Sequence, residues 1–566
     1  MNRQGAHLGG HPILREAFTP KLISALREGY GLARLRADAL SGLTVAIVAL
    51  PLSMAIAIAS GATPAAGLFT AIIGGFLVSA LSGSRHQIGG PAGAFIVLVA
   101  ATIDQHGFDG LLLATMLAGA MLIAVGALRL GTYIKYIPHP VLVGFTTGIA
   151  IIIFASQIRD LLGLALPGKE PAALIPKLQA LVAALGTLNP AALGLSALTI
   201  ATILAVRRWR PSWPGLLIAV ALAAATTFLL NLPVETIGSR FGGIPRALPA
   251  PHLPAFSLDK LIAVLPAALS IAVLGGIESL LSAVVADGMS GRRHRSNMEL
   301  VAQGVANIGS PLFGGICVTG TIARTATNIR AGGVTPVAGM LHAAFMLLFM
   351  LVAAPLASYI PLAALAGVLA VVAWNMAEKA AFAAILRHSR ADSLVLLSTF
   401  LLVIFEDLMV GIGVGVVLGS LIFMHRMASI VTVEAGMDAG LVDYDEAGHD
   451  EPQASGNGKR DGETFHYKIT GPLFFGASSH VATVLDRVGP FPERIVLDLC
   501  GVPFADSSAA VSLKAMIDKA LRHGSAVEIR GAGRQVRAVL GHEGIDERLV
   551  SFREIAQKPG KGVVWG

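Results

Sequence analysis

Residues 39–84 read ALSGLTVAIVALPLSMAIAIASGATPAAGLFTAIIGGFLVSALSGS. They contain no Asp, Glu, Lys or Arg, and residues 331–377 also lack these four residue types. A helix that spans a bilayer needs about 20 predominantly apolar residues, so each stretch is long enough for two spans joined by a short uncharged turn. Only 14% of the 566 residues are charged, compared with roughly 25% in soluble domains. The sequence therefore predicts a polytopic α-helical membrane protein that contacts the lipid bilayer.

Charge-poor apolar segments predict about 14 transmembrane segments. They are centred in residues 40–60, 63–82, 91–103, 110–129, 138–158, 190–206, 214–231, 262–286, 298–315, 320–330, 334–354, 360–377, 392–406 and 408–425. An even number of passages places both termini on the same side of the membrane. If that side is the cytoplasm, 20 of the 27 Lys and Arg residues up to Arg426 are cytoplasmic and six lie on the opposite side, as the positive-inside rule expects.

This charge distribution predicts a multi-pass protein of the inner (plasma) membrane with cytoplasmic N- and C-termini. The net charge of +7 follows the membrane topology, so it does not predict binding to nucleic acid. The two cysteines lie far apart in different kinds of sequence and imply no disulfide framework.

The character of the sequence changes after Arg426. Residues 494–499 predict a buried strand, residues 507–523 an amphipathic helix and residues 526–530 a further strand, which together indicate a small α/β domain. The expected organisation is a cytoplasmic N-terminal arm (1–37), a transmembrane domain (38–430, with repeats at about 38–232 and 260–427), an acidic and Gly-rich linker (431–463) and a cytoplasmic α/β domain (464–566).

Two of the apolar segments are too short for ordinary spans and begin with helix-breaking residues. The first begins at Gly89-Gly90-Pro91-Ala92-Gly93-Ala94-Phe95 and the second near Gly314–Thr321. Each is the third span of its group of seven, and such matched short segments point to the binding site of a secondary transporter. Because helix N-termini carry partial positive charge and unpaired N–H groups, two facing tips would attract a small anion. The alternative is that both segments are merely kinked structural helices.

Glu278 and Arg324 lie in otherwise uncharged runs, where ionisable residues are functional candidates by default. Arg324 would add a positive charge to the anion pocket, or it would form a structural ion pair with Glu278. The Glu278 carboxylate could bind Na⁺ together with hydroxyl oxygens such as those of Ser282 and Thr321, or it could carry a proton. The alternative for Glu278 is a snorkelling side chain near the end of its helix.

The sequence offers no nucleophile triad, phosphate loop or paired-carboxylate site, and its histidines lack metal-ligand spacing. We therefore expect no enzyme, no cofactor and no resident metal, apart from Na⁺ or H⁺ as a coupling ion.

Motifs spread over about residues 35–560 resemble the SulP (sulfate permease) anion transporters. The matching stretches are ALPLSMA (49–55), SGATPAAGLF (60–69), GSRHQIGGPAGA (83–94), IPHPV (137–141), GFTTG (144–148), ESLLSAVVAD (278–287) and TGTIARTATN (319–328). The tail sequence LDLCGVPFADSS (497–508) is similar to a STAS domain.

The resemblance implies a 7+7 inverted repeat with core and gate subdomains, a homodimer, and an elevator-like motion of the core that carries the anion. The implied substrate site draws on Gly90, Pro91, Ala92, Gly93, Ala94 and Phe95 from the first half-helix and on Gly320, Thr321, Ile322 and Arg324 from the second. The implied coupling-ion site draws on Glu278, Ser282 and Thr321, and the choice between Na⁺ and H⁺ stays open.

Leu52 and Ile56 stand where many sulfate-type members carry Gln and an aromatic residue. Because of this departure, the resemblance does not identify the substrate. Sulfate, bicarbonate and dicarboxylates are the expected substrates, with a sulfate-type inorganic anion favoured. The Asp506-Ser507-Ser508 turn resembles the phosphorylated site of bacterial anti-sigma-factor antagonists, so Ser507 and Ser508 are candidate regulatory sites where a cytoplasmic protein could bind. The same turn could simply cap a helix.

Two other functions stay open at this point. One is an uncoupled anion channel, voltage-responsive protein or exchanger of the same fold. The other is a membrane-anchored signalling protein in which the STAS domain does the work.

Overall fold

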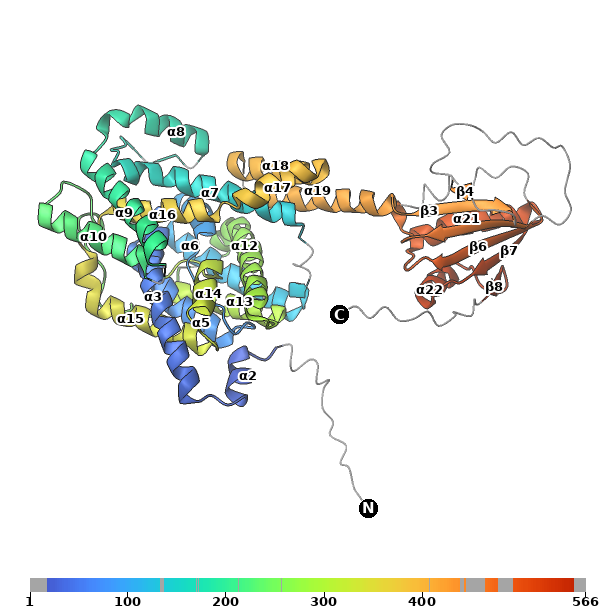
Figure 1. The fold of residues 1–566 in the computed structure, drawn as a ribbon, viewed down its shortest axis with the longest axis horizontal. Helices are drawn as coiled ribbons and strands as arrows, with labels where there is room; N and C mark the ends of the chain where they lie inside the picture. The colour runs from blue at the N-terminus through green and yellow to red at the C-terminus, as the bar shows by residue number, and fades with distance from the viewer. Residues whose placement is uncertain are drawn as a thin grey trace, which may run out of the picture. The chain divides into compact units, whose positions relative to one another are not determined.

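The computed structural model describes residues 18–132, 137–168, 170–171, 173–211, 213–255, 257–406, 408–437, 442–443, 464–476 and 492–553. The chain divides into two units, Met1–Val416 and Val417–Gly566, and each is described by itself. Helices make up the first unit, and a sheet with helices makes up most of the second (Figure 1).

Apolar helices follow one another through the first half of the chain. They are α2 (Lys21–Arg27), α3 (Leu32–Ala59), α4 (Pro64–Phe69), the π-helical turn η1 (Thr70–Gly74), α5 (Gly75–Leu81), the 3-10 turn η2 (Gly93–Phe95), α6 (Ile96–Ala127), α7 (His139–Leu162), α8 (Leu174–Ala183), the 3-10 turn η4 (Leu185–Thr187), α9 (Pro190–Trp209) and α10 (Gly215–Leu230).

The second half repeats this order of long and short helices. They are α11 (Ile237–Phe241), α12 (Leu258–Ser290), α13 (Ser296–Leu312), α14 (Ile322–Arg330), α15 (Val337–Ala357), α16 (Leu362–Met376), α17 (Lys379–His388), α18 (Arg390–Phe405) and α19 (Leu408–Ala428).

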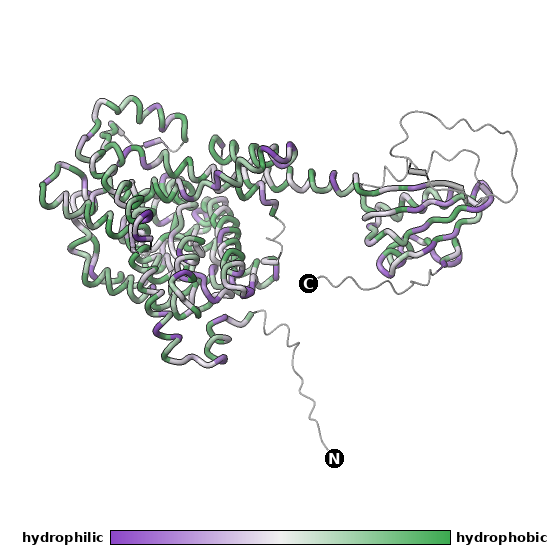
Figure 2. The backbone as a smooth tube through the Cα atoms, viewed as in Figure 1, coloured by the Kyte–Doolittle hydropathy of each residue, from purple (hydrophilic) through white to green (hydrophobic). Residues whose placement is uncertain are grey.

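Each of the 14 predicted segments falls on a helix. Within the described residues, nine helices are long and apolar enough to cross a membrane by themselves, and Figure 2 shows their hydrophobic character along the tube. Segments 91–103 and 110–129 are joined in α6, whose backbone breaks at Gly107 (φ 71°). α3 begins at Leu32, so the first helix extends into the expected N-terminal arm.

The two halves of the first unit pack against each other as an inverted repeat. α13 packs on α6, and α5, the equivalent of α13, packs on α15, the equivalent of α6. Likewise α12 packs on α6 as α3 packs on α15. The helices approach closely: a Cβ at Gly119 of α6 would lie 2.6 Å from the Gly304 carbonyl oxygen of α13, and a Cβ at Gly304 would lie 2.5 Å from that of Gly119. The matched packing of α13 on α6 and of α5 on α15 is what a two-fold relation between the halves produces.

The second unit contains a six-stranded sheet in the order β4-β3-β5-β6-β7-β8. Its elements are β3 (Thr432–Met437), β4 (Val442–Asp443), β5 (Thr464–Thr470), β6 (Arg494–Gly501), α21 (Ser507–Arg522), β7 (Ala526–Arg530), α22 (Arg534–His542) and β8 (Ser551–Arg553). β5 to β8 run parallel, and β3 is antiparallel to β5. Leu497, Ile529 and Leu513 lie in its buried core.

One expected boundary is wrong in this unit. Residues 432–437 were assigned to the linker, but they form β3 and pair with β5 along its whole length. Val431 and Val433 alternate with polar neighbours and are buried in the core of the unit, so this stretch has the period of a strand. The acidic and Gly-rich composition that indicated a linker begins inside the strand, at Glu434. Most of residues 434–463 lie outside the described residues.

Candidate functional site

Two helices begin in the interior of the first unit, each directly after a two-residue strand. β1 (Gly89–Gly90) precedes η2 and α6, and β2 (Thr319–Gly320) precedes α14. The strands pair antiparallel, with Gly89 opposite Gly320 and Gly90 opposite Thr319. Because this pairing joins equivalent positions of the two repeats, it brings the N-termini of both half-helices together.

The polar groups at these two helix tips are mainly backbone N–H groups. Ala92 and Thr321 are the N-cap residues, and among the described residues neither accepts a capping hydrogen bond through a side chain. The expected site residues Gly90, Pro91, Ala92, Ala94, Phe95, Gly320 and Thr321 are buried and Gly93 is partly buried, whereas Ile322 is 40% exposed. N–H groups at such tips are available to a ligand because the first turn of a helix has no internal partner for them.

Each tip is shaped around a side chain near the other tip. A Cβ at Gly90 would lie 1.7 Å from Nη1 of Arg324, and a Cβ at Gly320 would lie 1.6 Å from Nε2 of Gln87. The Arg324 guanidinium therefore lies directly against the backbone that leads into the first half-helix. Glycine is required at both positions because any larger residue would displace these groups.

Arg324 is buried, with 2% of its surface exposed. Its Nη2 donates a hydrogen bond to Ser53 Oγ of α3 at 3.0 Å. Its Nε and Nη1 are buried without a hydrogen-bond partner in the described part of the chain. Buried arginine nitrogens are normally paired, so the N–H groups of these two nitrogens mark a place for an acceptor that the described residues do not supply.

Glu278 of α12 contributes a second unpartnered group. Its Oε2 is buried and has no hydrogen-bond partner among the described residues, and the same is true of Thr321 Oγ1. The charges of Glu278 and Arg324 attract each other, but no hydrogen bond or ion pair joins these two described side chains. The ion pair considered from the sequence is therefore not formed.

Ser282 differs from the other expected coupling residues. Its hydroxyl is fully buried and donates to Thr325 Oγ1 at 3.2 Å. In this arrangement it joins α12 to α14.

Hydrogen bonds from residues that sequence reasoning did not select hold the two tips in register. Ser279 Oγ accepts the Gly320 N–H at 3.0 Å, and Gln87 Nε2 donates to the Ser279 carbonyl at 3.1 Å. Asn328 Nδ2 donates to the His86 carbonyl at 2.9 Å. The sequence shows these residues as polar positions in apolar segments, which was the available signal for them. This signal does not reveal with which distant segment each side chain forms its hydrogen bond.

In the second unit, Asp506 caps α21. Its Oδ1 accepts the Ala509 N–H at 2.9 Å, and its Oδ2 accepts the Phe475 N–H at 2.9 Å. The capping interpretation of this turn is thus confirmed. Ser507 and Ser508 are exposed beside it, and their phosphorylation stays a prediction.

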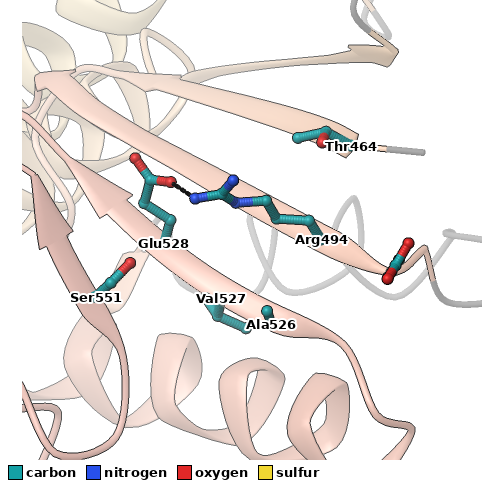
Figure 3. Close-up of a pocket in the computed structure, with 7 residues that line it drawn as sticks. Thr464, Arg494, Ala526, Val527, Glu528 and Ser551 are labelled. Atoms are coloured by element: carbon teal, nitrogen blue, oxygen red, sulfur yellow. Dashed lines mark hydrogen bonds and ion pairs between the residues drawn. The ribbon is translucent and has the colours of Figure 1, made fainter. Parts of the chain in front are cut away.

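A surface hollow of about 380 Å³ lies at the start of strands β5 to β8 in the second unit. It is lined by Thr464, Glu493, Arg494, Ala526, Val527, Glu528 and Ser551. Figure 3 shows Arg494 and Glu528 pointing toward each other from neighbouring strands as an ion pair. A hydrogen bond from Arg530, together with the charge of Arg494, holds the pKa of Glu528 below its ordinary value.

Comparison with known proteins agrees with this architecture. The model of the sulfate permease family matches residues 35–399, and the STAS domain model matches residues 458–557. A Bacillus subtilis protein named "Putative sulfate transporter YvdB" is 40% identical over 525 residues, which cover 92% of this chain and 96% of that protein. The bicarbonate transporter BicA of Picosynechococcus is 31% identical over 542 residues, covering 92% of each chain.

Solved structures give the same result for the fold. The transmembrane domain of a cyanobacterial bicarbonate transporter is 34% identical, with a TM-score of 0.62, and covers 68% of this chain and 99% of that one. The murine Solute Carrier 26 family member A9 anion transporter in the inward-facing state is 19% identical, with a TM-score of 0.83, and covers 97% and 94% of the two chains. The latter supports the fold alone.

These comparisons confirm the predicted fold class and the predicted family. They also confirm that the chain is not an enzyme, because its relatives are named as transporters. The chain belongs to the sulfate permease family and carries a C-terminal STAS domain.

Proposed function

We propose that this protein carries a small inorganic anion, with sulfate favoured, across the inner membrane. The observation that carries the proposal is the buried Arg324, whose Nε and Nη1 have no hydrogen-bond partner among the described residues where the two half-helix tips meet. A buried cation without a partner is costly, by several kcal/mol or more. A bound anion would offset that cost, which makes this place selective for negative charge. Relatives named for sulfate and for bicarbonate support the substrate class.

The anion in this proposal is held mainly by backbone. In this proposal Gly93, Ala94 and Ile322 supply N–H groups at the two helix N-termini, and Arg324 supplies the full charge. The anion is surrounded by the remaining expected site residues, which are Gly90, Pro91, Ala92, Phe95, Gly320 and Thr321. Two partial dipole charges and one guanidinium suit an oxyanion. Such a site distinguishes sulfate from bicarbonate only through the different size and hydration of the two anions.

Coupling is assigned in this proposal to Glu278. Glu278 Oε2 and Thr321 Oγ1 have no hydrogen-bond partner in the part of the chain that the structure describes. Together they would bind Na⁺, or Glu278 would carry a proton. Ser282 would join this site only if its hydroxyl left Thr325. Neutralising Glu278 would remove its attraction for Arg324 and leave the guanidinium free for the substrate.

Transport would follow an elevator-like motion. The core in this proposal comprises α3 to α6 and α12 to α15, which pack together around the half-helices, and the gate comprises α7, α9, α10, α16, α18 and α19. We further propose that the transmembrane domain ends near residue 430, that the protein forms a homodimer, and that both termini are cytoplasmic.

Uptake into proteoliposomes tests this function. Vesicles with the purified protein are given labelled sulfate, bicarbonate or fumarate, with and without inward Na⁺ or proton gradients. We expect sulfate to accumulate only with one of the gradients. Conductance without accumulation would indicate the uncoupled channel instead, and no uptake of any of the three anions would contradict the proposal.

A further inference from the structure

Three of the four tryptophans of the protein lie on the surface of the first unit, at the ends of two helices. Trp209 is the last residue of α9, Trp213 follows four residues later, and Trp374 lies in the last turn of α16. Their side chains are 78%, 59% and 65% exposed, in that order. Tryptophan is highly buried on average, and in membrane proteins it gathers at the level of the lipid headgroups. Its exposure at three neighbouring positions therefore indicates a partner that is partly apolar and partly polar.

Direct contacts hold these two helix ends together. α9 packs beside α16 (Figure 1), and Arg207 Nη1 at the end of α9 donates a hydrogen bond to Asn375 Oδ1 of α16 at 3.0 Å. Lys379 Nζ lies 4.3 Å from the centroid of the Trp374 ring, where the π face attracts a cation. Tryptophan rings and cationic groups thus share one surface. We call residues 207–211, 213 and 374–379 the Trp–Arg surface.

Positive charge dominates the Trp–Arg surface. Its four cationic side chains are exposed, namely those of Arg207, Arg208, Arg210 and Lys379. None of the four forms an ion pair with another described residue. The one acidic residue of the Trp–Arg surface is Glu378. The surface is therefore complementary in charge to an anionic partner.

The length of α9 places the Trp–Arg surface at the level of the lipid headgroups. α9 is apolar enough to span a membrane and has 20 residues, so it is about 30 Å long, which is the thickness of the hydrocarbon core. Lipid phosphates then lie within reach of the arginines, and acyl chains lie beside the indole rings. A second copy of this surface would instead bring like charges together, which is unfavourable. A phospholipid therefore fits this surface better than a second copy of the chain does.

We propose that the Trp–Arg surface binds an anionic phospholipid. The lipid phosphate interacts with Arg208 and Arg210, and the tryptophan rings contact the glycerol and the upper part of the acyl chains. This inference goes beyond the proposed function, because it depends neither on the anion that is carried nor on the coupling ion.

Native mass spectrometry of the purified, delipidated full-length protein tests this inference. The protein is titrated in detergent and without sulfate, either with phosphatidylglycerol or with phosphatidylcholine that has the same acyl chains. Because several cationic side chains act on one headgroup, we expect the first phosphatidylglycerol to bind at least about tenfold more tightly than the first phosphatidylcholine. Equal affinity for the two lipids would overturn the inference.

A pair of double variants assigns the preference to the Trp–Arg surface. The combined substitutions Arg208→Gln and Arg210→Gln should bring the affinities for the two lipids to within about twofold of each other. The matched control combines Arg292→Gln and Arg293→Gln, which removes the same charge from an exposed loop after α12, and it should keep the wild-type preference.

Three results for these variants would contradict the inference. One is an unchanged preference for phosphatidylglycerol after the loss of Arg208 and Arg210. Another is an equal loss of preference in both double variants, which would show attraction by net charge alone. The third is a lower dimer fraction in the same spectra with unchanged lipid preference, which would make the Trp–Arg surface an interface between copies of the chain.

Discussion

Gly90 of the first repeat has no side chain, which leaves room for the guanidinium of Arg324 from the second repeat. The sequence predicted both residues as parts of the site, because one breaks a helix and the other is an isolated charge in an apolar run. It did not predict that Arg324 would donate a hydrogen bond to Ser53 rather than pair with Glu278. Such pairings depend on how distant segments pack, which local pattern does not encode.

At Gly90 we predict a steric effect. Gly90→Ala would place a Cβ 1.7 Å from Arg324 Nη1, and displacing a buried side chain costs about 1–3 kcal/mol. We expect a lower thermal unfolding midpoint and at least a tenfold loss of sulfate uptake. The matched control is Gly194→Ala on an exposed face of α9, where nothing lies within 4 Å of the new Cβ. Wild-type uptake by Gly90→Ala would show that the guanidinium need not stay where it lies.

At the scale of elements, apolar length and periodicity predicted the helices and the central strands of the second unit well. The two half-helices were predicted because Gly and Pro interrupt them in equivalent spans, whereas the antiparallel pairing of β1 with β2 joins residues too far apart for any local signal. The prediction of a linker was wrong at β3 because so short a strand shows only two alternating apolar residues, Val431 and Val433. The neighbouring acidic and Gly residues favoured a linker over a strand.

Glu528 of strand β7 allows a prediction about how the stability of the second unit depends on pH. Arg530 and Arg494 hold the pKa of Glu528 below its ordinary value, so its carboxylate stabilises the folded sheet above about pH 4.5. This contribution is lost as the pH falls through the lower folded value. Glu528→Gln should cost about 1–2 kcal/mol near pH 7 and should weaken the loss of stability on acidification.

Hydrogen exchange of the β6 and β7 amides in the full-length protein measures this local stability from pH 7 to about pH 3, so that the range extends below the ordinary pKa of a glutamate. Glu547→Gln, at an exposed glutamate of the same unit, is the matched control. If Glu528→Gln and the wild type lost protection in parallel as the pH falls, the ion pair would not contribute as argued.

At the scale of the whole molecule, the inverted repeat explains why the residues of the proposed substrate site and of the proposed coupling site come from elements that pack together. α12 carries Glu278, α14 carries Arg324, and both pack beside the strand pair that joins the repeats. Family resemblance predicted this architecture, and composition alone predicted only the membrane class.

Coupling is the property of the whole molecule that Glu278 should control. Glu278→Gln removes the charge that a coupling cation would neutralise. We expect it to lower gradient-driven sulfate accumulation by at least tenfold while sulfate exchange across the membrane continues. Glu378→Gln, at an exposed position before α17, should accumulate sulfate as the wild type does. Unchanged gradient-driven accumulation by Glu278→Gln would remove Glu278 from the coupling mechanism.

Binding of sulfate to Arg324→Gln, compared with Arg330→Gln, tests the anion site most directly. Both arginines lie on α14, but Arg324 is buried at the meeting of the two tips and Arg330 is exposed at the other end of the helix. Hydrogen bonds to a charged group contribute about 1.5–3 kcal/mol each, and every 1.4 kcal/mol is about tenfold in Kd. Calorimetric titration should give a Kd about 10- to 100-fold weaker for Arg324→Gln and within twofold of the wild type for Arg330→Gln. Equal sulfate affinity in the wild type and Arg324→Gln would place the anion elsewhere.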